Sequence, residues 1–432
     1  MPVPLLDVNA QNHPLAAELT AAFARVLASG QFINGPDVPA FEAECAPFTG
    51  VPHNLGVSSG TDAILLALMA LGIGPGDEVI VPAFTFFATA GCVSRVGATP
   101  VFADVCPICF NLDPVHAAGL ITAKTKAIIP VHLFGQMADM DAIMALATQH
   151  NLYVIEDAAQ AFGATYKGKP AGSIGHFGCY SFFPSKNLGA LGDAGLLSTS
   201  DPTLAARVRI LRVHGMEPKY YHQEIGGNFR LDTLQAALLR VKLAHYPAYT
   251  AARQANAARY QAALSPLPGV LTADPRDCKC LPRQDTRHTE AISNLKSQIS
   301  DSNLENSKLK SEISNPNVQI SNLKSQIPRL ILPVAYPHNG HIWNQYTLRV
   351  PGEGRREALK THLQSAGIGC EIYYPLTLDQ QPCYQSLPPR AALPVSHRLA
   401  TEVISLPVYP ELPPARLEEV IQQLAIKINQ AS

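Results

Sequence analysis

The sequence has no excess of charge of either sign, because 33 Lys and Arg residues stand against 34 Asp and Glu residues. With a formal net charge of −1, it has no basic character of the kind that binds nucleic acid or an anionic membrane. It also lacks a long hydrophobic run, since the longest apolar stretch, Ala63–Gly74, is too short to span a bilayer. The start, Met1–Pro14, contains Asp7 and no basic region, so we expect no signal peptide. We therefore expect neither a nucleic-acid partner nor a membrane partner.

Cysteine is too scarce for a disulfide scaffold, because the 432 residues include only nine cysteines, an odd number. This usage is typical of reduced thiols, and we expect a cytoplasmic protein. Two pairs, Cys106-x-x-Cys109 and Cys278-x-Cys280, look like halves of a metal site. Neither pair has a matching Cys or His pair at zinc-finger spacing, so the sequence predicts no metal ion. The sequence also lacks a GxGxxG after the first strand and a GxxxxGK[ST], so dinucleotide and P-loop sites have no support.

What the sequence does have is an alternation of short β-branched runs and longer helical ones between about residues 55 and 215. The expected strands are Glu78–Val81, Thr99–Val105, Ala127–His132, Tyr153–Glu156, Gly178–Phe183 and Gly195–Ser198. The expected helices between them are Thr61–Leu71, Ala83–Val96, Asp139–His150 and Thr203–Val213. This alternation predicts an α/β fold with βαβ units around a mainly parallel sheet. Ligands of such folds bind at the carboxyl ends of strands and at helix N-termini.

The second half of the chain predicts a smaller α+β unit. A long helical segment over 231–264 is expected to bend near Pro247. After it we expect a strand, a helix, an extended segment and a closing helix, at Ile342–Val350, Arg355–Ala366, Cys370–Tyr374 and Pro414–Ile428. We therefore place a large domain at residues 1–245 and a small C-terminal domain at residues 246–432.

One segment within the small domain, 286–328, has a different composition. It is rich in Ser, Asn, Lys, Gln and Ile, and isoleucines recur in it at multiples of seven residues. This heptad repeat has the character of a coiled coil, but Asn306 and Pro316 occupy core positions of the repeat. We expect a poorly ordered, low-complexity surface insertion, and an ordered helical hairpin is the alternative.

Four stretches contain residue types that can carry chemistry. The small residues Ser58 to Asp62 lead into a helix, whose free N–H groups and positive dipole end suit a phosphate. The alternative is a helix start that only caps itself. Glu156 and Asp157 end a buried strand, where a carboxylate needs a cation or a proton donor as partner. An Asp there can hold a protonated ring nitrogen, or it can simply cap the next turn.

The other two stretches are a lysine loop and an aromatic cluster. Lys186 follows a strand in a loop of apolar and small residues, a setting that lowers the pKa of an amine and makes it nucleophilic. Ser181, five residues earlier, is placed to contact a phosphate, although an exposed loop lysine is the alternative. One of Phe84, Phe86 and Phe87 can stack on a planar cofactor, or all three can be core. In order, the four stretches describe a site for pyridoxal 5′-phosphate.

With these motifs the chain resembles the DegT/DnrJ/EryC1/StrS sugar aminotransferases, which are fold-type I enzymes that use pyridoxal phosphate. The resemblance runs from about Leu5 to Leu264 and from His341 to the end. Its markers are Gly30 to Pro36, Ser59 to Ala63, Gly74 to Val79, Glu156 to Gln160, Ser181 to Lys186 and Asn228 to Asp232. The resemblance implies a large cofactor-binding domain with a mainly parallel seven-stranded sheet flanked by helices, and a smaller α+β domain.

The resemblance also implies residue roles. Lys186 matches the lysine that holds the cofactor covalently and moves protons, and Asp157 matches the acid on the pyridine nitrogen. The other cofactor contacts that it implies are Gly60, Thr61, Phe86, Gln160, Ser181 and Asn228. Asn228 matches a residue that reaches the cofactor phosphate across a subunit interface, which implies a homodimer with shared active sites.

The implied reaction moves an amino group from an amino acid, by family habit glutamate, to a keto group of a nucleotide-linked sugar. Phe183 stands where enzymes for 4-keto sugars often have His, which favours a 3-keto sugar. The candidate substrate contacts are Tyr220, Tyr221, Arg230 and Tyr374. Two alternatives stay open: a dehydratase or lyase that uses the same cofactor, which Lys186 argues against, and a non-catalytic regulatory relative.

Overall fold

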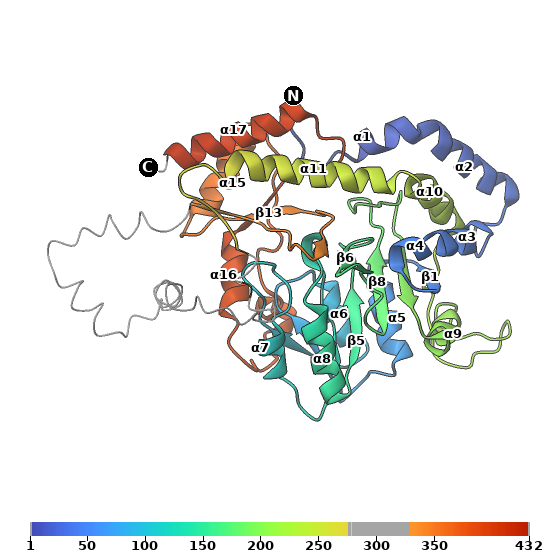
Figure 1. The fold of residues 1–432 in the computed structure, drawn as a ribbon. Coiled ribbons are helices and arrows are strands. Elements are labelled where there is room, and N and C mark those ends of the chain that lie inside the picture. Colours follow the sequence, from blue (N-terminus) through green and yellow to red (C-terminus); the bar gives the residue numbers. More distant parts are fainter. Residues whose placement is uncertain (1, 275–277, 279–328, 431–432) are drawn as a thin grey trace.

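The centre of the computed structural model, which describes residues 2–274, 278 and 329–430, is a seven-stranded sheet (Figure 1). Its strand order is β1-β9-β8-β5-β4-β2-β3. The strands are β1 His53–Val57, β2 Glu78–Pro82, β3 Thr99–Ala103, β4 Thr125–Ile128, β5 Tyr153–Asp157, β8 Phe177–Ser181 and β9 Gly195–Thr199. Within this sheet β9 runs antiparallel to its neighbours β1 and β8, and the other pairs are parallel. The predicted α/β fold with a mainly parallel seven-stranded sheet is confirmed.

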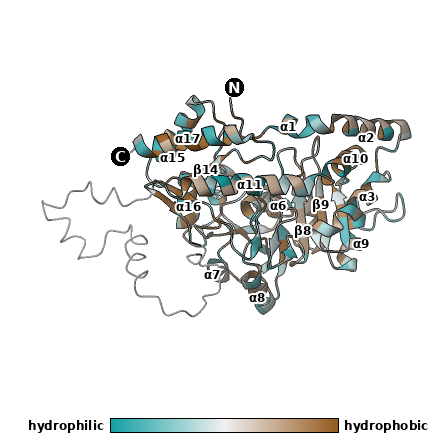
Figure 2. Ribbon diagram, turned by 45° about the horizontal axis from the view of Figure 1, so that its top comes forward, coloured by the Kyte–Doolittle hydropathy of each residue, from teal (hydrophilic) through white to brown (hydrophobic). Residues whose placement is uncertain are grey.

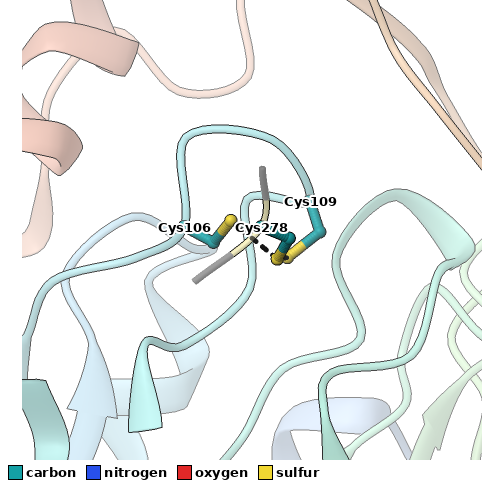
Figure 3. Close-up of side chains that lie close together, drawn as sticks. All are labelled: Cys106, Cys109 and Cys278. Carbon is teal, nitrogen blue, oxygen red and sulfur yellow. Dashed lines mark hydrogen bonds between the residues drawn. The ribbon is translucent and has the colours of Figure 1, made fainter. Parts of the chain in front are cut away.

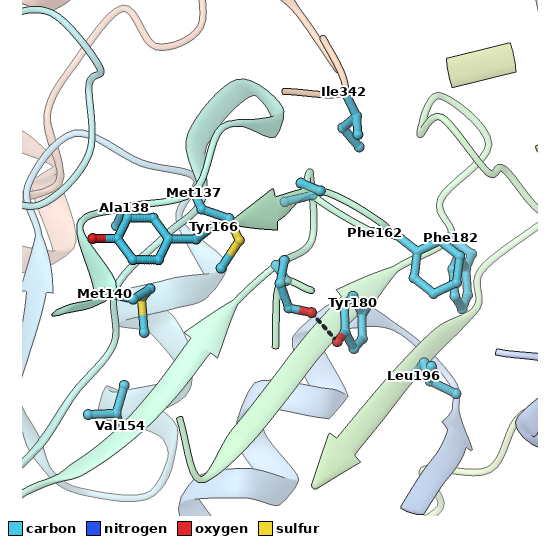
Figure 4. Packing of buried hydrophobic residues seen from close by; sticks show 14 of the residues in the cluster. Met137, Ala138, Met140, Val154, Phe162, Tyr166, Tyr180, Phe182, Leu196 and Ile342 are labelled. Atoms are coloured by element: carbon cyan, nitrogen blue, oxygen red, sulfur yellow. Dashed lines mark hydrogen bonds between the residues drawn. The ribbon is translucent and has the colours of Figure 1, made fainter. Parts of the chain in front are cut away.

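Helices cover both faces of this sheet. The helices on one face are α5 Gly60–Ala70, α6 Ala88–Arg95 and α9 Pro202–Leu211, and those on the other are α3 Asp37–Glu44, α8 Met140–His150 and α10 Thr233–Leu243. Each face of the sheet has its own hydrophobic core. Because side chains alternate along a strand, Val79 and Val81 pack into the core on the α5 face, and Ile80 packs into the core on the α3 face. Figure 4 shows the core on the α3 face, in which Phe162 and Phe182 pack together.

A second sheet lies in the C-terminal part of the chain. Its order is β10-β11-β13-β14, with β10 Val270–Thr272, β11 Leu330–Leu332, β13 Tyr346–Arg349 and β14 Val403–Leu406. A third, small sheet joins β12 Asn339–Gly340 to β6 Thr165–Tyr166 and β7 Lys169–Pro170, so it connects this part to the first.

The helices of the C-terminal part are α11 Tyr246–Leu264, α15 Arg355–Ser365, α16 Pro394–Glu402 and α17 Pro414–Gln430. Tyr260 and Leu264 of α11 pack into the same core as Leu417, Val420 and Leu424 of α17. Figure 1 shows α11 and α17 crossing the top of the molecule. In Figure 2, α17 and the N-terminal helix α2 Ala16–Ser29 carry both hydrophilic and hydrophobic colours, as expected for helices with one face on a core.

The structure divides the long helical segment predicted over 231–264 into two helices, α10 and α11. Pro247 lies in the first turn of α11, where its missing N–H leaves no intrahelical hydrogen bond unmade. The division into domains at 245/246 stays a prediction, and the insertion 286–328 lies outside the described residues. In the described part of the chain, no helix combines the length and apolar character needed to cross a membrane.

Several element boundaries differ from the predictions. The helix predicted over Ala83–Val96 begins only at Ala88, because Ala83 instead bonds through its N–H to Ala103 and through its carbonyl to Leu378. Strand β4 ends at Ile128, before the predicted end at His132, and Pro130, which has no N–H, follows. No local sequence pattern predicted β1, β10, β11, β14 or the helices before residue 50, which are α1 Val8–Asn12, α2, α3 and α4 Ala46–Thr49.

Candidate active site

The polar residues singled out in the sequence lie where strands of the large sheet end. Strand β5 ends at Asp157 and its neighbour β8 ends at Ser181, five residues before Lys186. Helix α5 begins at Gly60, directly after β1 and Ser58-Ser59. The carboxyl ends of parallel strands meet at one edge of a sheet, so the fold brings these segments to the edge where α/β proteins bind ligands.

Asp157 is a buried carboxylate with two donors from its own chain. The Thr89 hydroxyl donates to Oδ2 at 2.8 Å, and the Ala159 N–H donates to Oδ1 at 3.2 Å. Burial raises the pKa of Asp157, and the hydrogen bond from Thr89 opposes that shift. A cationic group beside this carboxylate stabilises its charged form, so the position suits a protonated ring nitrogen.

Lys186 lies in the loop after β8 and has an amine of lowered basicity. Desolvation lowers its pKa from 10.5 to about 8, and the charge of Asp157 opposes the shift. The neighbouring Asn187 anchors the loop, because its Nδ2 donates to the Ile342 carbonyl at 2.9 Å and its Oδ1 accepts from Asn344 at 2.9 Å. An amine with a pKa near 8 is partly uncharged near neutral pH, which makes it a nucleophile and a base.

The start of α5 packs closely against the end of β8. Ser59 caps the helix, since its Oγ accepts from the Asp62 N–H at 3.0 Å. A Cβ at Gly60 would lie 2.7 Å from the Cβ of Ser181, so only glycine allows this approach. The capping alternative is therefore realised, and the first turn still presents N–H groups beside the Ser181 hydroxyl. This arrangement suits a phosphate.

Gln160, Tyr374 and Phe86 form a third side of the site. The Gln160 side chain accepts from the Phe134 N–H at 2.8 Å and donates to the Tyr374 hydroxyl at 3.2 Å. Burial raises the pKa of Tyr374, so its hydroxyl stays protonated. The Phe86 ring lies 6.2 Å from the Tyr374 ring and is 58% exposed, whereas Phe84 is buried. Phe86 therefore has a ring with an open face for a planar ligand.

The remaining candidates lie along the segment that runs from α9 to α10. Asn228 pairs with Val213, and Arg230 pairs with Val57 at the end of β1. Tyr220 and Tyr221 are 76% and 67% exposed on the intervening loop. Thr61 lies apart from this segment, in the first turn of α5, where its carbonyl accepts from the Cys92 thiol at 3.2 Å.

Two residues that hold the carboxylates at the end of β5 were not among the predicted site residues, although the sequence favoured a structural role for His132. Thr89, which donates to Asp157, had no sequence signal, because nothing in the sequence relates it to a residue 68 positions away. His132 is the partner of Glu156, with its Nε2 2.8 Å from the carboxylate and both side chains fully buried. Its Nδ1 accepts from the Ala138 N–H, so Nε2 carries the proton that Glu156 accepts.

Comparison with known proteins places the chain in a family. The sequence model of the DegT/DnrJ/EryC1/StrS aminotransferase family matches residues 14–319 and 317–425. A pleiotropic regulatory protein from Geobacillus stearothermophilus is 41% identical over 98% of each chain. A dTDP-3-amino-3,4,6-trideoxy-alpha-D-glucose transaminase from Streptomyces venezuelae is 38% identical over 99% of this chain and 98% of its own.

Among solved structures, DesV of S. venezuelae in complex with a ketimine intermediate superposes with a TM-score of 0.82. It is 38% identical, and the match covers 99% of this chain and 98% of that one. The agreement in sequence and in fold extends over nearly the whole chain. The chain therefore belongs to the DegT/DnrJ/EryC1/StrS aminotransferase family.

Proposed function

We propose that this protein is a nucleotide-sugar aminotransferase that uses pyridoxal 5′-phosphate. In the proposed reaction an amino group passes from an amino acid, expected to be L-glutamate, to a keto group of a nucleotide-linked sugar. The main support for this function is the position of the buried Asp157, which accepts a hydrogen bond from Thr89 and lies at the same sheet edge as the weakly basic amine of Lys186.

The residues at this edge fit pyridoxal phosphate in three respects. Asp157 offers a carboxylate for the protonated pyridine nitrogen, and Lys186 offers an amine for the aldehyde. The contact between Gly60 and Ser181 leaves the start of α5 and a hydroxyl side by side for the phosphate. When bound, the cofactor supplies a carbonyl carbon that accepts amino groups and a ring that takes up an electron pair.

The chain's own residues then have distinct tasks. Lys186 Nζ would take the proton from the α-carbon of the amino donor and deliver it to the carbon that was the cofactor's aldehyde carbon. Asp157, oriented by Thr89, keeps the ring nitrogen protonated, so that negative charge developing on the substrate is stabilised. Gln160 and Phe86, which both contact Tyr374, are the residues that would hold the ring in place.

We infer a homodimer in which Asn228 of one subunit reaches the cofactor phosphate of the other. Large hydrophobic side chains lie exposed in this chain, among them Phe32, Ile33, Phe183 and Ile225. A subunit interface would bury apolar groups of this kind. Tyr220, Tyr221, Arg230 and Tyr374 are the proposed sugar contacts, and a cytoplasmic location stays a prediction.

A 3-keto sugar is the proposed acceptor. Phe183, with its exposed ring, lies three residues before Lys186, and the name of the S. venezuelae relative specifies a 3-amino sugar. The name of the Geobacillus relative favours a regulatory role as the second candidate. The amine and carboxylate at the site support catalysis over that role.

An absorbance titration tests the function. Pyridoxal phosphate bound to Lys186 should absorb near roughly 410–430 nm, and L-glutamate should replace this band with one at shorter wavelength. Lys186→Ala should lose the first band, whereas Lys124→Ala, at an exposed lysine, should keep it. A band that no amino donor changes would favour lyase chemistry, and a protein that never takes up the cofactor would favour the regulatory role.

A further inference from the structure

Three thiols from distant parts of the chain, none of which belongs to the candidate active site, lie close together (Figure 3). Cys106 and Cys109 lie in the loop after β3, and Cys278 follows β10. The Cys278 Sγ lies 3.0 Å from the Cys106 Sγ and 3.9 Å from the Cys109 Sγ. All three sulfur atoms lie within 4.8 Å of one another, and all three side chains are buried.

The 3.9 Å separation matches that of two ligands of one ion, and the 3.0 Å separation is shorter, so ion binding would move Cys106 and Cys278 slightly apart. In a tetrahedral zinc site with Zn–S bonds of about 2.3 Å, the sulfur atoms lie about 3.8 Å apart. Zinc is bound readily by thiolates, and the cluster, as far as the structure describes the chain, consists of three thiols and no carboxylate. Three thiolates leave one of the four positions of zinc for another donor.

The backbone of the Cys106–Cys109 turn is shaped around the first sulfur. The Ile108 N–H donates to the Cys106 Sγ at 3.4 Å, which fixes the position of this sulfur in the turn. Phe110 ends the turn with a φ of 65°, a left-handed conformation that is unfavourable for a bulky residue. The turn is further held by Arg349, whose Nη1 donates to the Pro107 carbonyl at 3.0 Å.

The surroundings of the cluster are apolar. Ile108, Val334 and Tyr336 pack against the three cysteines. Apolar surroundings of this kind limit the access of bulk solvent to a bound ion.

We propose that Cys106, Cys109 and Cys278 bind one structural zinc ion through their thiolates. The ion links the segment after β10 to the loop that follows β3. This inference departs from the sequence expectation of no metal, which considered each half-site alone, whereas the fold joins residues 172 positions apart. It does not depend on the proposed aminotransferase function.

The link has a consequence for the candidate active site. Phe110, next to Cys109, packs edge-on against Phe134 with ring centroids 5.4 Å apart. The Phe134 N–H donates to Gln160 at 2.8 Å. The zinc ion therefore acts as a positioning element for Gln160, at a distance from the reacting atoms.

Metal analysis of the full-length protein, purified without a histidine tag under reducing conditions, tests the proposal. We expect about one zinc per chain, and a loss of about tenfold or more in Cys109→Ser and in Cys278→Ser. Cys383→Ser, which removes an exposed thiol, should keep the zinc. Circular dichroism of each variant shows whether it folds.

A cobalt titration keeps the proposal testable if the variants do not fold. The wild-type protein, freed of metal by a thiol reagent and a chelator and then reduced, should bind Co²⁺ with the visible bands of tetrahedral thiolate ligation. Zinc should displace these bands. Reduced wild-type protein that binds neither Zn²⁺ nor Co²⁺, or Cys278→Ser protein that retains zinc, overturns the proposal. A disulfide between Cys106 and Cys278 in protein purified without reductant, together with no metal after reduction, overturns it as well.

Discussion

Two carboxylates at the end of β5 are neighbours in the sequence and differ in their surroundings. Glu156 accepts from the backbone N–H groups of Gly172, Ile174 and Gly175 and from His132, at 2.6 to 2.8 Å. Asp157 accepts from Thr89 and Ala159 and lies at the sheet edge where Lys186 lies. The Glu156 carboxylate is satisfied by its own chain and holds a loop, whereas Asp157 retains capacity for a ligand.

The largest effect on turnover is expected for a change at Lys186, whose amine lies at the ligand-binding edge of the sheet. Lys186→Ala should lower turnover by about 10⁴-fold, equal to about 5.5 kcal/mol, because this variant removes the base that takes the α-proton. Steady-state transamination with glutamate and a keto-sugar acceptor measures it. Substantial turnover by a folded Lys186→Ala protein would contradict the role of this lysine.

On the structural side, Glu156→Gln should lower the free energy of unfolding by about 3 kcal/mol. The glutamine amide has one accepting oxygen, whereas the carboxylate has two. Some of the buried N–H groups of His132 and of the 172–175 loop therefore lose their acceptor. Denaturant unfolding measures the loss. The control Glu44→Gln removes an exposed ion pair with Arg240 and should cost less than about 1 kcal/mol. Equal losses in the two variants would remove the distinction between the carboxylates.

Asp157→Asn should act on the chemistry more than on the fold. We expect a fall in turnover of about 100-fold, or about 2.7 kcal/mol, because a neutral amide cannot stabilise a protonated ring nitrogen. The measurement is turnover together with the absorbance spectrum of the bound cofactor. Asp113→Asn, at the cap of α7 Pro114–Ala118, is the control and should leave both unchanged. If Asp157→Asn had the turnover of the wild-type protein, Asp157 would have a structural role and not a catalytic one.

The smallest effect is expected for the residue that orients Asp157. Thr89→Val removes the 2.8 Å hydrogen bond while keeping the side-chain volume, and should lower turnover about tenfold, or about 1.4 kcal/mol. Rescue by Thr89→Ser would show that the hydroxyl is responsible. Thr85→Val is the matched control, at a buried threonine whose hydroxyl lies 3.5 Å from that of Thr89. A similar loss in both valine variants would point to packing.

The pH dependence of cofactor uptake tests whether the amine of Lys186 has a lowered pKa. Because the pKa of Lys186 is lowered to about 8, the uncharged amine that attacks the aldehyde increases as the pH rises towards that value. The rate of cofactor binding to the protein freed of cofactor should rise about tenfold per pH unit below about pH 8 and level off above it. A rise that continues to about pH 10 would show an ordinary, exposed lysine.

The parts of the fold that were predictable are those with strong local patterns. The strands β2, β3, β5, β8 and β9 follow apolar, β-branched runs, and their positions follow from alternation with helices. Short elements such as β14 escaped prediction, because a four-residue apolar run does not distinguish a strand from a buried helix segment. The same limit applies to β10 and β11, which are three residues long.

The order of the site residues and the kind of chemistry that they can perform follow from the sequence alone. Asp157, Ser181 and Lys186 each lie at or just after a strand end, and a strand end in a parallel sheet faces the ligand edge wherever the strand lies. The hydrogen bonds of Thr89 with Asp157, of His132 with Glu156 and of Cys278 with Cys106 are known only from the three-dimensional fold. These contacts join residues that are 24 to 172 positions apart, and no local periodicity or spacing records which of many distant partners the folded chain brings within hydrogen-bond distance.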